Sequence, residues 1–313
     1  MNNFKKIGLT ALAGSLVATS AFAGELTVTG SAGINVSNIS GSADAATGKD
    51  WSMPNSVYLN GSSELDNGMT VSVSFELDSG VGNAAGVGPF DNQSVTVSSD
   101  ALGTLVFYGH PGTSAQSALD TTAAGDIWNE TLGITGIQAS ASGDDSLMYT
   151  LPSMLDGLSL SVSMSPGRAN QETHTAWGAT YSGIEGLSVS YGVGDSGAPG
   201  SEIESTTMKA SYSMGPITVA ASNTEVDGSG SANDREVTSY KVAYTVSENL
   251  SIAYGTETFD KASSSVDEEV EAISASYTTG GVTLSATQYE AKGAVNTAGA
   301  KTEKWALGAS FAF

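Results

Sequence analysis

The sequence predicts an all-β protein: a 16-stranded antiparallel transmembrane β-barrel with short periplasmic turns, long external loops and an infolded third loop. Three observations support this fold class. Apolar and small polar residues alternate with a period of two along most of the chain. A strand that ends on tyrosine recurs every 31–33 residues. The chain finishes on an aromatic, alternating stretch, EKWALGASFAF.

The first 23 residues have the pattern of a secretory signal peptide. Lys5 and Lys6 precede a short apolar stretch, and Ala21-Phe22-Ala23 has the form of an A-x-A cleavage site. A membrane anchor is the alternative, but the apolar stretch is shorter than the ~20 residues that a spanning helix needs. We therefore expect residues 1–23 to be removed on export and residues 24–313 to form the barrel domain.

Alternation identifies the strands. In MTVSVSFELDS, Val71, Val73, Phe75 and Leu77 face one way, while serine, threonine and acidic side chains face the other. The stretches GLSLSVSMS, GLSVSYGVG and GGVTLSATQYE have the same pattern. Each stretch has one apolar face and one small, polar face, as expected for a strand between lipid and water.

The repeat orders the strands and their connections. Tyr149, Tyr181, Tyr212, Tyr244 and Tyr277 each end a strand, after which a short turn leads into a new alternating strand. The return connections, such as EVDGSGSANDRE, are longer and polar. A period in this range first suggests a solenoid or propeller. Alternating short and long connections favour a barrel instead, and the tyrosines suit an aromatic girdle at the membrane interface.

An even number of strands puts both chain ends on the periplasmic side and lets the last strand pair with the first, so that no edge stays open. We expect the final strand to turn Trp305, Leu307, Ala309, Phe311 and Phe313 towards lipid. The expected strands cover residues 25–38, 54–65, 69–79, 92–99, 104–109, 145–151, 157–165, 173–182, 186–194, 205–214, 216–226, 235–246, 249–259, 269–279, 281–290 and 302–313.

One connection is unusually long. Residues 110–144 contain no strand of membrane-spanning length, and they form the third long loop. A long loop in a compact domain is usually functional or disordered. Apolar members such as Ile127, Trp128 and Leu132 indicate that this loop packs on something. We expect it to fold back into the lumen; a mobile external loop is the alternative.

Composition excludes some partners. The formal net charge is −22, with 11 Lys and Arg against 33 Asp and Glu. Nucleic acid is therefore not expected as a partner, because phosphate binding needs clustered basic residues. There is no cysteine, so no disulfide framework stabilises the fold.

The chain resembles the Gram-negative general porins, most closely their alphaproteobacterial branch. The resemblance rests on SSELDNGMTVSVSFELDSG, on ALGTLVFYG before the long third loop, on MYTLPSMLDGLSLSVS and on the terminal WALGASFAF. It implies an outer-membrane homotrimer of barrels, each with a water-filled pore that the third loop narrows and that passes small polar solutes and ions. It also implies that the outer-membrane assembly machinery recognises the strand ending in Phe313.

Period two assigns side chains to the lumen. If the repeated tyrosines face lipid, Lys209 and Lys241 face water at a similar depth. Loop carboxylates opposite wall ammonium groups are then expected to set a transverse field across the constriction. The alternatives are aspartates that only cap turns and lysines that are solvated wall charges. The candidate pore-lining residues are Asp120, Asp126, Glu130, Glu76, Asp78, Lys209, Lys241 and His110.

The expected ion selectivity follows from the small number of basic residues. Where relatives often place an arginine after the GTLVFYG-type strand, this chain has His110, and its only arginines, Arg168 and Arg235, are expected in or beside external loops. We expect a cation-preferring pore. Acidic positions that could bind Ca²⁺ or Mg²⁺ loosely are Glu202, Glu204, Asp227, Asp234, Asp267, Glu268 and Glu269; otherwise no cofactor is expected.

Other functions fit less well. A hydrolase needs a nucleophile with a base, and neither His110 nor His174 lies in a triad-like sequence context; we expect no enzymatic activity. A substrate-specific outer-membrane channel is the closest alternative. A secreted β-solenoid or surface structural protein is a more distant one, because it would not alternate short and long connections.

Overall fold

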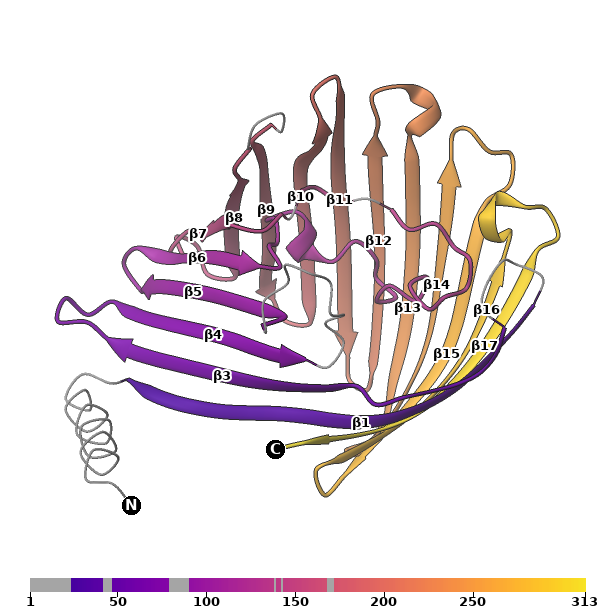
Figure 1. Cartoon of the computed structure of the whole chain (residues 1–313), viewed down its shortest axis with the longest axis horizontal. Helices are drawn as coiled ribbons and strands as arrows, with labels where there is room; N and C mark the ends of the chain where they lie inside the picture. Colours follow the sequence, from indigo (N-terminus) through magenta and orange to yellow (C-terminus); the bar gives the residue numbers. More distant parts are fainter. Residues whose placement is uncertain (1–23, 42–46, 79–89, 138, 142, 168–171) are drawn as a thin grey trace, which may run out of the picture.

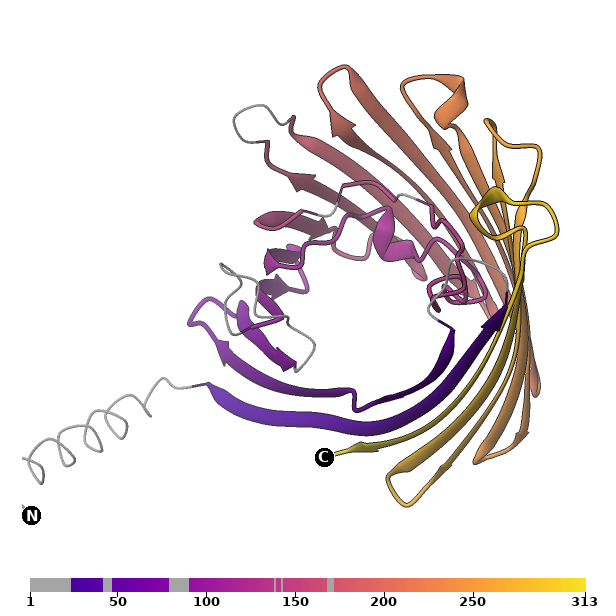
Figure 2. The same ribbon diagram turned by 45° about the vertical axis from the view of Figure 1, so that its right-hand side comes forward.

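The computed structural model describes residues 24–41, 47–78, 90–137, 139–141, 143–167 and 172–313, so the expected signal peptide lies outside the described residues. The chain forms a barrel of antiparallel strands, and one segment of the chain lies inside it (Figures 1 and 2). None of the described helical turns is long and apolar enough to cross a membrane.

The strands closely follow the regions of alternating sequence. They are β1 (Glu25–Gly41), β2 (Gly48–Ser52), β3 (Asn55–Glu64), β4 (Thr70–Asp78), β5 (Asn92–Ser99), β6 (Gly103–His110), β7 (Ser146–Thr150), β8 (Leu158–Ser165), β9 (His174–Ile184), β10 (Leu187–Ala198), β11 (Ser201–Met214), β12 (Ile217–Asp227), β13 (Arg235–Ser247), β14 (Leu250–Lys261), β15 (Glu268–Thr279), β16 (Val282–Lys292) and β17 (Lys301–Ala312). Short 3₁₀ turns are η2 (Ser117–Leu119), η3 (Ser231–Asn233) and η4 (Ala294–Asn296).

The strands close into a ring of sixteen. Segments β2 and β3 both pair with β1, and together they make one barrel strand, interrupted at Met53-Pro54. Proline lacks the N–H that a sheet ladder needs, which accounts for the break at this position. The other strands pair with their neighbours in the sequence, and β17 pairs with β1 from Ser31↔Ala312 to Gly41↔Thr302. This closure confirms the predicted barrel and excludes a solenoid.

One predicted loop is wrong. The polar stretch between residues 194 and 205 was expected to be a long external loop, but β10 continues to Ala198 and β11 begins at Ser201. Only Pro199 and Gly200 remain between the two strands. Proline suits the second position of a tight turn, and Gly200 supplies the positive φ, 79°, that the third position requires. Local turn chemistry here prevails over the loop-like composition.

The barrel surface is inverted relative to a soluble protein. Apolar side chains point outward, with Met208 55%, Val242 49% and Leu307 52% exposed, as expected of a surface that meets lipid. Strands β9 to β17 are long, whereas β4 to β7 are short (Figure 1). The chain therefore has a tall wall and a low wall, and the internal segment lies against the tall wall.

Candidate functional site

The segment inside the barrel is the third loop, predicted at residues 110–144; in the structure it runs from residue 111 to residue 145 between β6 and β7 and is called loop 3 below. Serine side chains on the inner face of the tall wall accept hydrogen bonds from its backbone. The N–H of Ala123 donates to Ser222 Oγ at 2.8 Å, and the N–H of Ala124 donates to Ser239 Oγ at 2.9 Å. The expected inward folding of this loop is therefore confirmed (Figure 2).

Glycines on the inner wall let loop 3 come close. A Cβ atom on Gly178 of β9 would lie 2.4 Å from the backbone oxygen of Ala115, and one on Gly255 of β14 would lie 2.8 Å from Ala124 Cβ. Real side chains do not approach that closely, so these wall positions need glycine. The small residues of the lumenal face thus make the seat of the loop.

Two buried carboxylates of the wall bind the backbone of loop 3 between residues 127 and 135. Glu257 of β14 is fully buried, and its two oxygens accept the N–H groups of Ile127 at 3.2 Å and Trp128 at 3.0 Å. Glu268 of β15 is 3% exposed and accepts the N–H of Thr135 at 3.0 Å. Hydrogen bonds from neutral donors to a charged acceptor are stronger than those between neutral groups.

Apolar packing completes the attachment. Leu132 is fully buried against Val270 and Ala291 of the wall. Trp128 packs edge-on against Phe259, with ring centroids 6.2 Å apart. The apolar residues that the sequence analysis noted in the loop thus form a small core between loop and wall.

Two predicted loop carboxylates form ion pairs with that same wall. Asp120 Oδ2 lies 2.5 Å from Lys209 Nζ of β11, and Glu130 Oε2 lies 2.5 Å from Lys304 Nζ of β17. The expected arrangement, with loop carboxylates facing wall ammonium groups across the opening, is therefore wrong for these pairs. The loop lies directly on the lysines, so each pair is neutral overall.

Asp126 stabilises the loop's own fold. Its Oδ1 accepts hydrogen bonds from Thr122 Oγ1 at 3.0 Å and from Trp128 Nε1 at 3.2 Å, and its N–H donates to Thr122 Oγ1 at 2.7 Å. Its φ is positive, 54°, which aspartate tolerates better than most residues. This is the turn-capping role that the sequence analysis weighed as the alternative.

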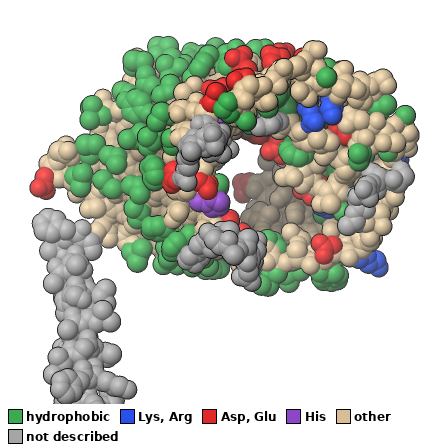
Figure 3. Space-filling view, turned by 45° about the horizontal axis from the view of Figure 1, so that its top comes forward, with side chains coloured by type: hydrophobic (Ala, Val, Ile, Leu, Met, Phe, Trp, Pro, Cys, Tyr) green, Lys and Arg blue, Asp and Glu red, His purple; other side chains and the backbone are tan. Residues whose placement is uncertain are grey.

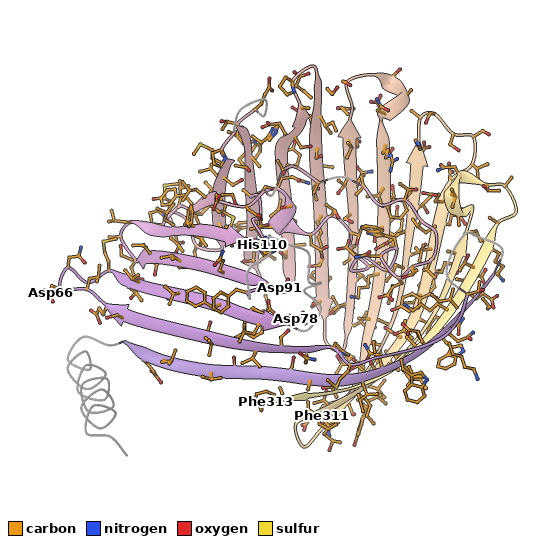
Figure 4. All side chains as sticks on the ribbon, viewed as in Figure 1. Asp66, Asp78, Asp91, His110, Phe311 and Phe313 are labelled. Carbon is orange, nitrogen blue, oxygen red and sulfur yellow. The ribbon has the colours of Figure 1, made fainter. Side chains whose placement is uncertain are left out.

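The low wall carries the other predicted acids. Glu76 of β4 is 9% exposed and hydrogen-bonds Tyr58 of β3, its register partner. The backbone oxygen of Glu76 also accepts the N–H of Asp91 at 2.9 Å. Figure 4 shows Asp78, Asp91 and His110 at the same end of three successive strands, β4, β5 and β6. Acidic side chains therefore gather on the side of the lumen away from loop 3.

His110 and Lys241 occupy different settings. His110 Nδ1 lies 2.9 Å from Asp144 Oδ1, so the pair joins the two ends of loop 3. Lys241 shares the inner face of β13 with Ser239 and is partly exposed to the lumen. Within the described part of the chain, Lys241 belongs to none of the ion pairs.

Sequence reasoning missed several residues that hold loop 3. Lys304 alternates with the lipid-facing Trp305, so period two alone would have placed it in the lumen. Arg235, expected in or beside an external loop, begins β13 and donates from Nη1 to Gly136 O at 3.0 Å. Arg168 lies outside the described residues. Glu268, expected among loosely cation-binding loop acids, is instead buried between loops, because two backbone N–H groups point at it.

The charge is divided unevenly between the walls. Lys49 is the only Lys or Arg between residues 24 and 165, a stretch that includes β1 to β8. The space-filling view onto the end of the barrel shows an opening through the molecule with acidic side chains and a histidine at its edge (Figure 3). Among the described residues, no group of three or more His, Asp or Glu is placed to hold a metal ion.

Comparison with known proteins agrees with this architecture. A sequence profile described as Gram-negative porin matches residues 8–271. No curated protein sequence matches the chain. The chain is similar in structure to Salmonella typhi OmpF in complex with daunomycin, with 13% identity over 93% of this chain and 98% of that chain and a TM-score of 0.70.

Two further solved structures are similar. The trimer form of Vibrio cholerae OmpT is 13% identical over 93% of this chain and 100% of that chain, with a TM-score of 0.68. A porin refined at 1.8 Å resolution is 16% identical over 92% of this chain and 100% of that chain, with a TM-score of 0.67. At these identities the likeness is one of fold.

Proposed function

The chain belongs to the Gram-negative porin family and forms a pore in the outer membrane, and from that premise we propose that small hydrophilic solutes and ions cross it by passive diffusion, with cations preferred over anions. The proposal includes the location of the narrowest part. It lies between loop 3 and the low wall, and the residues that line it are Glu76, Asp78, Asp120, Asp126, Glu130, Lys209, Lys241 and His110.

The cation preference is inferred from which charges in the pore are neutralised by a partner and which are not. Asp120 and Glu130 are each in contact with a wall lysine, so these charges contribute little net field. Glu76, Asp78 and Asp91 lie on a wall whose stretch of sequence has a single basic residue, Lys49 in β2. A water-filled passage lined mainly by one sign of charge concentrates the opposite ions.

The test is the reversal potential of the reconstituted protein across a salt gradient. We expect the native protein to favour cations, and the double substitution Glu76→Gln, Asp78→Asn to lower that preference. The matched control is Glu236→Gln, because Glu236 is exposed on β13 and hydrogen-bonds Asn223 beside it on the outer face. An anion preference in the native protein would contradict the proposal.

The assembly that we propose is a homotrimer. The trimer form of OmpT supports it by structural analogy, and the aromatic girdle supports it independently. Most outward tyrosines and tryptophans, such as Tyr212, Tyr240 and Trp305, lie on β9 to β17, while Trp51 of β2 is an exception. On β3 and β6, Tyr58 and Tyr108 are on the lumenal face instead, as judged from their strand partners, and the outward tyrosine of the low wall is Tyr149 of β7. A wall with few girdle residues suits contact with another copy rather than with lipid headgroups.

The remaining parts of the proposal concern export and chemistry. Residues 1–23 act as a signal peptide, and the outer-membrane assembly machinery recognises the last strand through Phe313. The pore acts as a channel without catalysis, in keeping with its family, and needs no resident cofactor. Divalent cations bind at most loosely to acidic side chains of the external loops.

A further inference from the structure

The external connection between β16 and β17, residues 293–300, called loop 8 below, has an unusual backbone. Val295 and Asn296 have positive φ angles of 55° and 51°. Positive φ is uncommon for residues other than glycine and is strongly disfavoured for a β-branched residue such as valine. Such a conformation persists only where surrounding contacts hold it.

Loop 8 is held by a contact with loop 3 and by a carboxylate of the wall. The N–H of Val295 donates to Gly133 O at 2.9 Å. The N–H of Asn296 donates to Glu268 Oε1 at 3.2 Å, while the other oxygen of the same carboxylate, Oε2, accepts the N–H of Thr135 at 3.0 Å. One buried side chain of the wall therefore joins an external loop to the loop inside the pore.

A carboxylate is well suited to this junction. It offers only acceptors, one oxygen towards each loop, and both facing groups are N–H donors. A glutamine of the same shape would turn an NH₂ group towards one of these donors, and that contact would be lost. A buried N–H without a partner is costly, so one loop would have to move.

We propose that Glu268 is a positioning residue that couples loop 8 to loop 3, so that a load placed on loop 8 from outside the cell changes conduction through the pore. This inference rests on the proposed function, because it takes loop 3 as the constriction. It differs from a purely structural role of Glu268, which would make the barrel less stable without linking the two loops.

The absence of cysteine allows a direct experiment. Val295 is 54% exposed, so Val295→Cys, labelled with a bulky maleimide on the purified full-length protein, places a load on loop 8 alone. Ser231→Cys in η3 is the matched control, because it is also exposed on an external connection. Single-channel current in planar bilayers is recorded before and after labelling. We expect the label at Val295, but not at Ser231, to change conductance or open-channel noise.

The coupling is tested by combining the label with Glu268→Gln. Loss of one hydrogen bond to a charged acceptor corresponds to about a tenfold change in an equilibrium. We therefore expect unlabelled Glu268→Gln to spend about ten times longer in altered conductance states. We also expect the label on Val295→Cys to have a smaller effect in this background. Glu269→Gln, at the neighbouring exposed position, should behave like the native protein.

A third label tests the constriction by loop 3 separately from the coupling through Glu268. Thr131 is an exposed residue of loop 3, and labelling Thr131→Cys should block much of the current if this loop lines the constriction. If that label changes nothing, the proposed constriction is wrong. If it blocks the pore while the Val295 label has no effect, or has the same effect with and without Glu268, the constriction stands and the coupling is overturned. Unchanged heat-modifiable migration in detergent gels shows that each variant has folded.

Discussion

At the scale of single residues, the charges of the pore work in pairs. The ion pair of Asp120 with Lys209 is partly exposed to water, with the two side chains 44% and 22% exposed. Exposed ion pairs contribute only about 0–1 kcal/mol to stability. The loop keeps its backbone hydrogen bonds to Ser222 and Ser239 whether or not this pair is present. Substitutions here should therefore act on the pore's field more than on its shape.

This gives a prediction for Asp120→Asn. Removal of the carboxylate leaves the Lys209 ammonium without its counter-charge, so cation preference should fall, and the change in stability should stay below about 1 kcal/mol. Reversal potentials in a salt gradient measure the first effect, and heat-modifiable migration measures the second. The double variant Asp120→Asn, Lys209→Met restores neutrality and should return selectivity towards the native value. A rise in cation preference in the single variant would contradict the pairing.

At the scale of elements, strands were easier to predict than their connections. Because the barrel wall requires one apolar and one polar face, alternation placed the sixteen strands to within a few residues, except that it missed the β2 part of the second strand. Connections follow other rules. Pro199-Gly200 makes a tight hairpin turn inside a polar stretch. Loop 3 is held against the tall wall by contacts such as that of Lys304 with Glu130, two residues that are 174 positions apart in the sequence. No local pattern encodes a pairing at that separation.

The seam between the first and last strands provides the second prediction. Gly30 and Phe313 exchange backbone hydrogen bonds of 2.8 and 2.9 Å. A Cβ atom on Gly30 would lie 2.6 Å from Phe313 Cζ and 2.8 Å from Ser56 O. Gly30→Ala should thus destabilise the closed barrel by about 1–3 kcal/mol, the usual cost of overpacking.

The temperature at which the folded form is lost in detergent gels measures this effect. Gly61→Ala is the matched control, because the added methyl group would meet only the side chain of Val73, at 3.2 Å. Equal melting temperatures for the two variants would show that the seam tolerates a side chain at residue 30. Deletion of Phe313 should reduce assembly into the membrane far more than it alters conductance of the pores that do form.

At the scale of the whole molecule, the two walls meet different surroundings. The tall wall carries the outward aromatic girdle and the inner seat of loop 3. The low wall has no such seat and only Tyr149 as an outward tyrosine, and the rest of its outer face is formed by aliphatic and phenylalanine side chains such as Leu59, Phe75 and Phe107. The sequence contained this asymmetry in the positions of its tyrosines, but strand register was needed to see which of them point inward.

The proposed trimer provides a prediction at the scale of the whole molecule. Leu59→Arg puts a charge on the outer face of the low wall, where a neighbouring copy would leave it buried without a partner. We expect folded monomers in place of trimers on mild-detergent gels or in light scattering. Val242→Arg places the same charge on the lipid-facing tall wall and should retain trimers, at a stability cost of up to about 2–4 kcal/mol. Trimers in both variants would place the interface elsewhere.

The pairing of β1 with β17 has a consequence for biosynthesis. Strand β1 is made first, but its partner β17 is made last. The barrel therefore cannot close before translation has reached β17. A polypeptide cut short before residue 301 would present β1 as an open edge, which invites aggregation or degradation. Closure of the barrel therefore requires β17: only a chain that includes residues 301–312 can pair with β1 and seal the wall in the membrane.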